Sequence, residues 1–314
     1  MKHIALIVLV LFTGLNACAW GFYGHRKINE IAVYTLPKPL FAFYKQNAAY
    51  ISKHATDADN RRYVSPDEAC RHYLDGDHYE CRVPFDTLPR RYREAIARYT
   101  EDSILAHGIV PWHIQTMLYR LTEAFKLKDR DRILKLSADL GHYVGDLHVP
   151  LHATSNYNGQ KTGQKGIHAL WESRLPELYF ENYDMFTGLA VYNNDPLGST
   201  WQAFEQSFSL VDSVLLTERL VSAGFSDNER YSWEQRGNTT VRVYSKAFCK
   251  AYHEALGDMV EARMRASVVL LGSFWYTCWV NAGQPDMEHM PLPDPQETEP
   301  PLPEKGQMLG REEE

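Results

Sequence analysis

Apolar residues recur at intervals of three and four along much of the chain, which is the spacing of a helix face that is buried on one side. The pattern predicts helices over residues 111–128, 131–146, 201–223 and 240–280. The last segment is long for one straight helix, and we expect Gly257 or Gly272 to interrupt it. No alternating run is long enough to predict a sheet. A body of about 260 residues without an internal linker therefore predicts one all-α, multi-helix domain.

The two ends of the chain differ from this body. Residues 1–19 combine Lys2, a short apolar run and the small residues Ala17, Cys18 and Ala19, which is typical of an export signal cleaved before Trp20. The alternative is a lipoprotein acylated at Cys18. Residues 284–314 hold seven of the 16 prolines and nine acidic residues against two basic ones, a composition that predicts disorder. We therefore divide the chain into a signal peptide (1–19), a domain (20–283) and a disordered tail (284–314), and expect a periplasmic or secreted protein.

Composition and charge exclude several classes of protein. With 44% hydrophobic and 23% charged residues, the chain is neither collagen-like nor wholly disordered. The net charge of −7 equals the charge of the acidic tail, so the totals show no basic surface for nucleic acid. Export would leave four cysteines in an oxidising compartment. Four cysteines permit three pairings, and the pairing of neighbours in the sequence would join Cys70 to Cys81 and Cys249 to Cys278; four buried free thiols are the alternative.

Histidines and carboxylates concentrate between residues 142 and 172. On a helix, His142 and Asp146 share a face because four residues separate them, and His168 and Glu172 repeat this spacing. His152 follows a proline, where the helix should end, so its side chain can enter the same cavity from a turn. Imidazoles and carboxylates without a thiolate are typical zinc ligands. The segment therefore predicts a metal site between helices.

Four strings resemble the motifs of a known superfamily. They are WGFYGH from Trp20, HYLD from His72, HYVGDLHVPLH from His142 and GIHALWES from Gly166. Together they resemble the zinc-dependent phospholipase C and S1/P1 nuclease superfamily, whose members are all-α and bind three zinc ions. One of these ions is held by the free α-amino group and carbonyl of an N-terminal Trp. The resemblance implies a trinuclear zinc cleft, and it makes cleavage after Ala19 a chemical requirement because an amide nitrogen cannot replace the amine.

Carried over position by position, the resemblance implies three sets of metal ligands. One zinc would bind Asp57, His72, His142 and a bridging Asp146; a second would bind His152, His168 and Glu172; the third would bind Trp20, His25 and Asp146. Asp57 and Asp146 are also the expected catalytic carboxylates. The distance along the chain to His72 favours Asp57, and Asp59 is the alternative ligand.

The reaction that these residues imply is the hydrolysis of a phosphate ester by a zinc-dependent hydrolase. Zinc ions bridged by Asp146 would lower the pKa of water, so no protein nucleophile is needed. The Asn-rich loop with Asn156 and Asn158 resembles the phospholipases C, which we favour. The HYLD string resembles the S1/P1 nucleases instead, and there Tyr73 and Asp75 would hold a stacked base. A third hypothesis, from another class, is a periplasmic zinc-binding protein without catalysis.

The expected partner is a phosphodiester, either a phospholipid head group or a single-stranded nucleic acid or nucleotide. No obligate protein partner is evident, and contact with a membrane surface would be transient. Without Lys2 and the acidic tail, the body has a net charge of −1. Three zinc ions would place six positive charges in one cleft, so the acidic composition does not argue against an anionic substrate.

Overall fold

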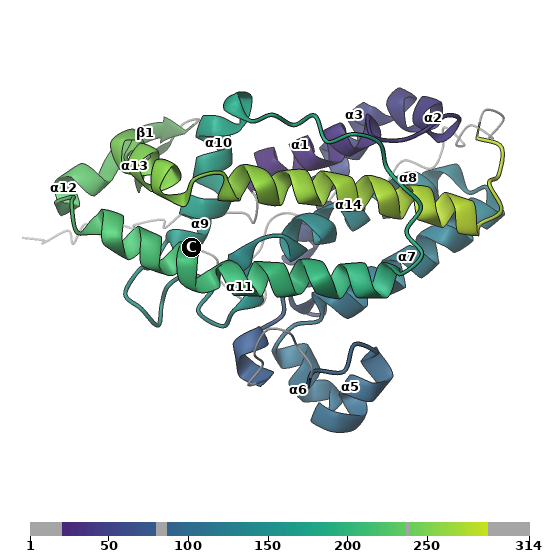
Figure 1. Cartoon of the computed structure of the whole chain (residues 1–314), viewed down its shortest axis with the longest axis horizontal. Coiled ribbons are helices and arrows are strands. Elements are labelled where there is room, and N and C mark those ends of the chain that lie inside the picture. Colours follow the sequence, from purple (N-terminus) through teal and green to yellow (C-terminus); the bar gives the residue numbers. More distant parts are fainter. Residues whose placement is uncertain (1–20, 80–86, 237–238, 288–314) are drawn as a thin grey trace, which may run out of the picture.

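A computed structural model describes residues 21–79, 87–236 and 239–287, which form an all-α protein with one small β-hairpin (Figure 1). The all-α fold class is thereby confirmed. The expected signal peptide and most of the acidic tail lie outside the described residues, so the three-part division of the chain stays a prediction. None of the described helices combines the length and the apolar character needed to cross a membrane.

Short elements alternate with four long helices. The first third contains α1 (Gly21–Val33), α2 (Leu40–Gln46), α3 (Ala48–Lys53), η1 (His54–Thr56), α4 (Asp57–Arg61), η2 (Ala69–Arg71), η3 (Gly76–Tyr79), α5 (Tyr92–Tyr99) and α6 (Glu101–Ala106). The middle contains α7 (Val110–Leu127), α8 (Arg130–Leu147), η4 (Pro150–Ala153), α9 (Ile167–Ala169), a π-helical turn η5 (Leu170–Arg174), α10 (Leu175–Tyr179) and η6 (Phe180–Asn182). The last part contains α11 (Pro196–Ser222), α12 (Asp227–Arg230), β1 (Tyr231–Arg236), β2 (Thr239–Tyr244), α13 (Lys246–Leu256) and α14 (Met259–Asn281).

The long helices α7, α8, α11 and α14 build the core. A two-residue turn joins α7 to α8: Lys128 adopts φ 55° at the end of α7, and the Asp129 side chain accepts from the backbone N–H of Arg132 to cap α8. Figure 1 shows α11 and α14 along the long axis of the molecule. In the core, the rings of Tyr44 and Trp275 stack with centroids 4.8 Å apart. This places the N-terminal helices against α14.

A close approach between α1 and α8 sets the position of the candidate metal ligands. The side chain of Asn29 on α1 donates to the carbonyls of Ala138 at 3.0 Å and Ile51 at 3.3 Å. A Cβ atom at Gly141 would lie 1.9 Å from Asn29 Oδ1, so only glycine lets the two helices come this near. His25 lies one turn before Asn29, and His142 follows Gly141 directly. The same contact therefore brings both histidine rings together.

The structure differs from the expected secondary structure at the β-hairpin. The first residues of the segment expected to be helical over 240–280 form β2, which pairs antiparallel with β1 from Tyr231↔Tyr244 to Arg236↔Thr239. Most hairpin side chains are exposed or half-buried, so neither face shows the alternation that predicts a strand. Of the two glycines expected to interrupt the helix, Gly257 does so with φ 64°, whereas Gly272 lies within α14.

The expected disulfide pairing is wrong for Cys249 and Cys278. Both are free, buried thiols: Cys249 Sγ lies 3.7 Å from the carbonyl oxygen of Tyr244, and Cys278 Sγ lies 3.4 Å from that of Leu118. Cys70 is also free, and its expected partner, Cys81, lies outside the described residues. The buried cysteines act as small apolar side chains in the core.

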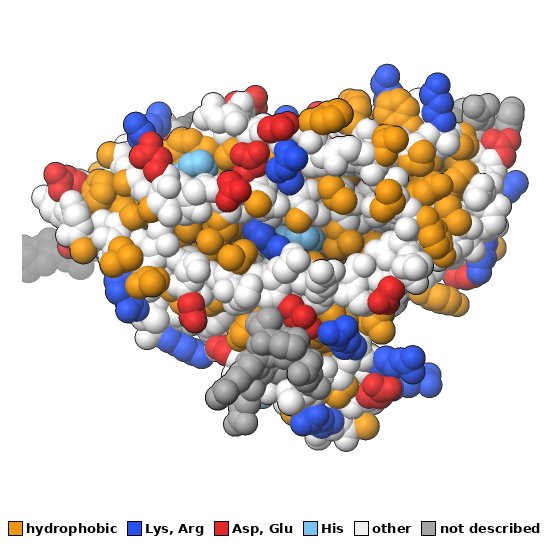
Figure 2. Space-filling view, viewed as in Figure 1, with side chains coloured by type: hydrophobic (Ala, Val, Ile, Leu, Met, Phe, Trp, Pro, Cys, Tyr) orange, Lys and Arg blue, Asp and Glu red, His pale blue; other side chains and the backbone are white. Residues whose placement is uncertain are grey.

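One face of the molecule is rich in apolar side chains. Figure 2 shows them scattered over α11, α14 and the long segment that crosses α14 in Figure 1, with few charged groups between them. Phe186, Leu189 and Val191 of this segment are exposed. Apolar surface of this kind is common on folded proteins and does not by itself define a site.

Candidate metal centre

Helix α8 carries the first two members of a buried cluster. His142 and Asp146 lie one turn apart, and His142 Nε2 is 3.2 Å from Asp146 Oδ2. His72, at the end of η2, brings its Nδ1 atom to 2.9 Å from the same Asp146 oxygen and to 3.0 Å from His142 Nε2. All three side chains are fully buried. Two nitrogens and one carboxylate oxygen thus converge on one small volume.

A second set of contacts extends the cluster towards α1. The rings of His25 and His142 stack with centroids 3.9 Å apart, and His25 Nε2 lies 3.4 Å from Asp146 Oδ1. Asp59, on α4, places Oδ1 3.5 Å from His142 Nε2. The two oxygens of Asp146 therefore face different histidines, which is the arrangement that a carboxylate needs to bridge two metal ions.

A third set lies beside these two. His168 Nε2 is 2.5 Å from Glu172 Oε2, and His152 Nε2 is 3.3 Å from the same oxygen. His152 lies on the 3₁₀ turn η4, while the π-helical turn η5 carries Glu172. A π-turn widens the helix locally and is frequent at functional sites. Glu172 also joins His25 and Asp146 in one group of atoms that lie within 4.8 Å of one another, so the three sets are contiguous.

The cluster has buried polar atoms without hydrogen-bond partners, which is the feature that a metal ion would explain. His25 Nε2, both carboxylate oxygens of Asp59, Asp146 Oδ1 and Glu172 Oε1 make no hydrogen bond. Burying such atoms unpaired costs on the order of 1–3 kcal/mol each. Imidazole and carboxylate donors of this kind suit Zn²⁺. The residues present therefore fit metal ions.

The electrostatics of the cluster point the same way. Burial, followed by the neighbouring His142, lowers the pKa of His25 and keeps its ring neutral. Burial also disfavours the charged form of His142, but Asp146 and Asp59 outweigh it and raise the pKa of His142 to about 9. Burial would raise the pKa of Asp146, yet His142 and His152 hold it well below its usual range. The carboxylates therefore stabilise a positive charge in the cluster. That charge is either a proton on His142 or a metal ion that takes the place of the proton.

Backbone carbonyls fix which nitrogen each histidine presents. His142 Nδ1 lies 2.9 Å from the Ala55 carbonyl oxygen, and His152 Nδ1 lies 2.6 Å from that of His72. A carbonyl oxygen only accepts, so Nδ1 of each ring donates and Nε2 is the nitrogen that faces the cluster. Both rings are thus held in the tautomer that a metal ligand requires.

The structure brings seven of the nine expected metal ligands together, and beside them it places Asp59, the alternative, instead of Asp57. Asp57 lies away from the cluster: its side chain is 24% exposed, and it pairs with His54 at 2.7 Å. The side chain of Asp59 is only 3% exposed and lies 3.8 Å from His72 Nδ1. The expectation that Asp57 is a ligand and a catalytic carboxylate is therefore not supported by its position. Trp20 lies outside the described residues, but Gly21 N donates to Ser173 Oγ at 3.1 Å, next to Glu172.

The four expected substrate-binding residues are buried. Tyr73 is 7% exposed and packs beside Gly108, where an added Cβ would meet the Tyr73 ring and carbonyl. Asp75 Oδ2 is 3.4 Å from His107 Nδ1. Asn156 donates to Thr162 Oγ1 and accepts from Lys161 N, and Asn158 accepts from Gly166 N. Both asparagine side chains thus hold the 154–165 loop in its conformation.

Glu68 is a buried residue of this site that the sequence patterns did not single out. Its Oε1 lies 3.7 Å from His72 Nε2 and accepts from the hydroxyl of Tyr143, while Oε2 accepts from Arg71 Nη1 at 2.6 Å. Burial would raise the pKa of Glu68, but His72, Arg61 and Tyr143 outweigh it and lower the pKa. The sequence pattern that could have identified Glu68 is its spacing of four residues from His72.

The fold and the site together define a class: an all-α protein with a buried, contiguous set of histidines and carboxylates suited to more than one metal ion. Residues 20–209 of the chain match the family described as S1/P1 Nuclease, which is well over half of the sequence. The chain therefore belongs to the S1/P1 nuclease family. No curated protein matches the sequence. Membership of this zinc-dependent family implies a hydrolase that acts on phosphodiester bonds.

Proposed function

We propose that the protein is a zinc-dependent phosphodiesterase that cleaves single-stranded nucleic acid or nucleotides. The observation that carries this proposal is the buried cluster around Asp146, in which four overlapping groups of three residues each bring their ligand atoms within 4.8 Å of one another. The family match over residues 20–209 supports a nucleic-acid substrate over the phospholipid that the loop sequence favours. Cleavage of a phospholipid head group remains the second outcome of the experiment below.

We assign eight described ligands to the metal ions. One ion would be held by Asp59, His72, His142 and Asp146, a second by His152, His168 and Glu172, and a third by His25 and Asp146 with the N-terminal residue of the mature chain. Bound zinc supplies Lewis acidity, which activates water and neutralises charge that develops on phosphoryl oxygens. The two faces of Asp146 supply the shared carboxylate, because Oδ1 faces His25 and Oδ2 faces His72 and His142.

The protein residues around the ions orient the ligands. The carbonyls of Ala55 and His72 hold the His142 and His152 rings in place. Ligand side chains buried to this degree have nearly fixed rotamers, so little reorganisation accompanies metal binding. Among the described residues, Tyr73, Asp75 and His107 lie next to one another near the His72 end of the cluster. This group is our candidate for contact with a base.

We further propose that the chain is exported and cleaved after Ala19, so that Trp20 becomes the first residue. Gly21 N lies 3.1 Å from Ser173 Oγ, adjacent to the ligand Glu172. His25 and Asp146 supply only two ligand atoms for the third ion, and a free α-amino group at Trp20 would supply another. Mass spectrometry of the exported protein tests this step: an N-terminal Trp20 supports it, and a lipidated Cys18 contradicts it.

The function is tested with purified protein that begins at Trp20. Single-stranded DNA, lecithin and a bis-aryl phosphodiester are the three substrates, each measured before chelation, after chelation and after zinc is restored. We expect release of nucleotides that is lost on chelation and recovered with zinc. Release of phosphocholine alone would support a phospholipase C instead. Zinc binding without hydrolysis of any substrate would support the non-catalytic alternative.

A further inference from the structure

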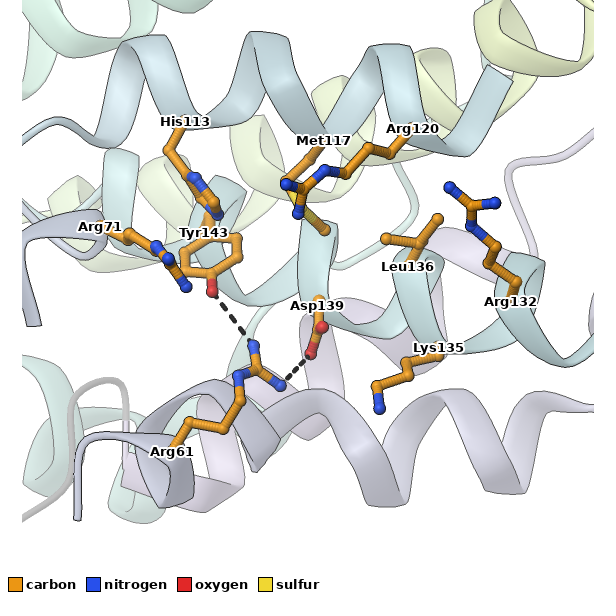
Figure 3. Close-up of a pocket in the computed structure, with 10 residues that line it drawn as sticks. All are labelled: Arg61, Arg71, His113, Met117, Arg120, Arg132, Lys135, Leu136, Asp139 and Tyr143. Atoms are coloured by element: carbon orange, nitrogen blue, oxygen red, sulfur yellow. Dashed lines mark hydrogen bonds and ion pairs between the residues drawn. The ribbon is translucent and has the colours of Figure 1, made fainter. Parts of the chain in front are cut away.

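A cavity of about 510 Å³ lies between α7 and α8 on one side and residues 61–71 on the other. Its charged lining is dominated by cations: Arg61, Arg71, Arg120, Arg132 and Lys135, against the single carboxylate of Asp139. Figure 3 shows the guanidinium groups of Arg61, Arg71 and Arg120 turned towards the middle of the pocket. The body of the chain has a net charge of only −1, so this concentration of positive charge is local.

Only some of these cations are neutralised within the protein. Arg61 donates to Asp139 Oδ1 at 3.0 Å and to the Tyr143 hydroxyl at 3.1 Å. Arg71 donates to Glu68 Oε2 at 2.6 Å. Within the described part of the chain, the side chains of Arg120, Arg132 and Lys135 have no carboxylate in ion-pair distance. Even after Glu68 and Asp139 are counted, the pocket keeps about three uncompensated positive charges.

The rest of the lining suits an organic ligand of limited size. Met117 and Leu136 form an apolar wall beside the cations. A volume of 510 Å³ lies in the range of about 300–1,000 Å³ that small-molecule sites occupy. A nucleic-acid strand would instead need a groove that continues along the surface. Paired arginine forks and an apolar wall are what recognise phosphate groups on a compact organic molecule.

We propose that this pocket binds a phosphorylated small molecule of nucleotide size that carries two or more phosphate charges. The site is separate from the metal cluster but adjoins it, because Tyr143 lines the pocket and follows His142 directly. Arg71 and Arg61 also contact Glu68. Glu68 lies beside Nε2 of His72, whereas Asp146 lies beside Nδ1 on the other side of the same ring. The pocket is therefore a binding site that does not depend on the identity of the substrate cleaved at the metal centre.

The test is calorimetric titration of the zinc-loaded protein with cyclic trimetaphosphate, a trianion that is a weak metal ligand. The pocket variant R120Q/K135Q removes two exposed cations, and R219Q/K246Q removes two exposed cations on α11 and α13 as the matched control. We expect one-to-one binding that the pocket variant weakens about tenfold and the control leaves unchanged. All four substitutions are at exposed positions, so near-identical melting temperatures check the fold.

Three results would overturn the proposal. The first is the absence of binding to the wild-type protein. The second is equal affinity in all three proteins or equal weakening by both double variants, which would place the anion at the metal centre or assign binding to net charge. The third result comes from a parallel titration with an oligothymidylate of 20 nucleotides. If only its binding depends on Arg120 and Lys135, the pocket belongs to a nucleic-acid surface and the small-ligand proposal is wrong.

Discussion

Asp59 Oδ1 lies 3.5 Å from His142 Nε2, inside the buried cluster. Asp57, two residues earlier on the same short helix, is bonded to His54 instead. Residues that are two apart in the sequence lie about 200° apart around the axis of an α-helix. Only one of the two carboxylates can therefore face the cluster. The chain thus contains its own matched pair for testing the ligand assignment.

The first prediction compares Asp59→Asn with Asp57→Asn. We expect Asp59→Asn to lower zinc content and to reduce hydrolysis by 100-fold or more, on the order of 3 kcal/mol in transition-state stabilisation. Asp57→Asn should keep both zinc content and hydrolysis within about threefold, because it removes only the partly buried pair with His54, which lies away from the cluster. Zinc analysis and initial rates on a bis-aryl phosphodiester measure the difference. A larger loss in Asp57→Asn than in Asp59→Asn would show that the structure selects the wrong carboxylate.

The second prediction concerns Glu68, which lies 3.7 Å from His72 Nε2. Because it orients a ligand without touching the metal volume, Glu68→Gln should lower zinc affinity about 10- to 100-fold and leave the fold intact. Glu123→Gln is the control, since Glu123 forms a surface ion pair with Lys126. Competition with a zinc chelator measures the affinity. If Glu68→Gln lowers the melting temperature of the zinc-loaded protein but leaves zinc affinity unchanged, Glu68 has only a structural role.

The third prediction is a pH dependence of stability from His148, which is buried outside the metal cluster. Burial and the nearby Arg263 lower its pKa to about 3, whereas the pKa in the unfolded chain is about 6.5. Between these values the unfolded chain binds a proton that the folded protein excludes, so the free energy of unfolding falls as the pH is lowered. The slope from one such group is at most about 1.4 kcal/mol per pH unit.

His148→Asn keeps a donor near the Val144 carbonyl, which His148 Nδ1 contacts at 2.7 Å, and removes the titration. Urea denaturation of the zinc-loaded proteins at pH 7.5 and pH 5 gives the comparison. The wild type should lose more stability than the variant over this interval. Equal losses would mean that His148 is accessible to protons in the folded state.

The helical framework could be predicted from the sequence because burial on one side of a helix leaves a period of 3.6 residues. The segments expected at 111–128 and 131–146 correspond to α7 and α8 to within one residue at each end. The hairpin left only a weak signal, because most of its side chains are exposed or half-buried and only Val241 and Tyr244 are buried. Sequence periodicity reports burial, and an element that buries little escapes it.

The members of the candidate metal cluster were predictable where a helix fixes their relative positions, and less so elsewhere. His142 with Asp146 and His168 with Glu172 follow from a spacing of four residues. The choice between Asp57 and Asp59 depends on where α4 begins and how it is rotated, which no short-range pattern determines. Glu68 shares the four-residue spacing with His72, but its segment folds as a 3₁₀ turn without apolar periodicity, so nothing marked it as helical.

The most direct test of the central claim is the metal dependence of phosphodiester cleavage by the protein that begins at Trp20. Zinc content is measured together with the rate of nucleotide release from single-stranded DNA, before chelation, after chelation and after zinc is restored. The account predicts bound zinc, loss of cleavage when it is removed, and recovery when it returns. Cleavage that continues at the same rate in protein stripped of metal would contradict it.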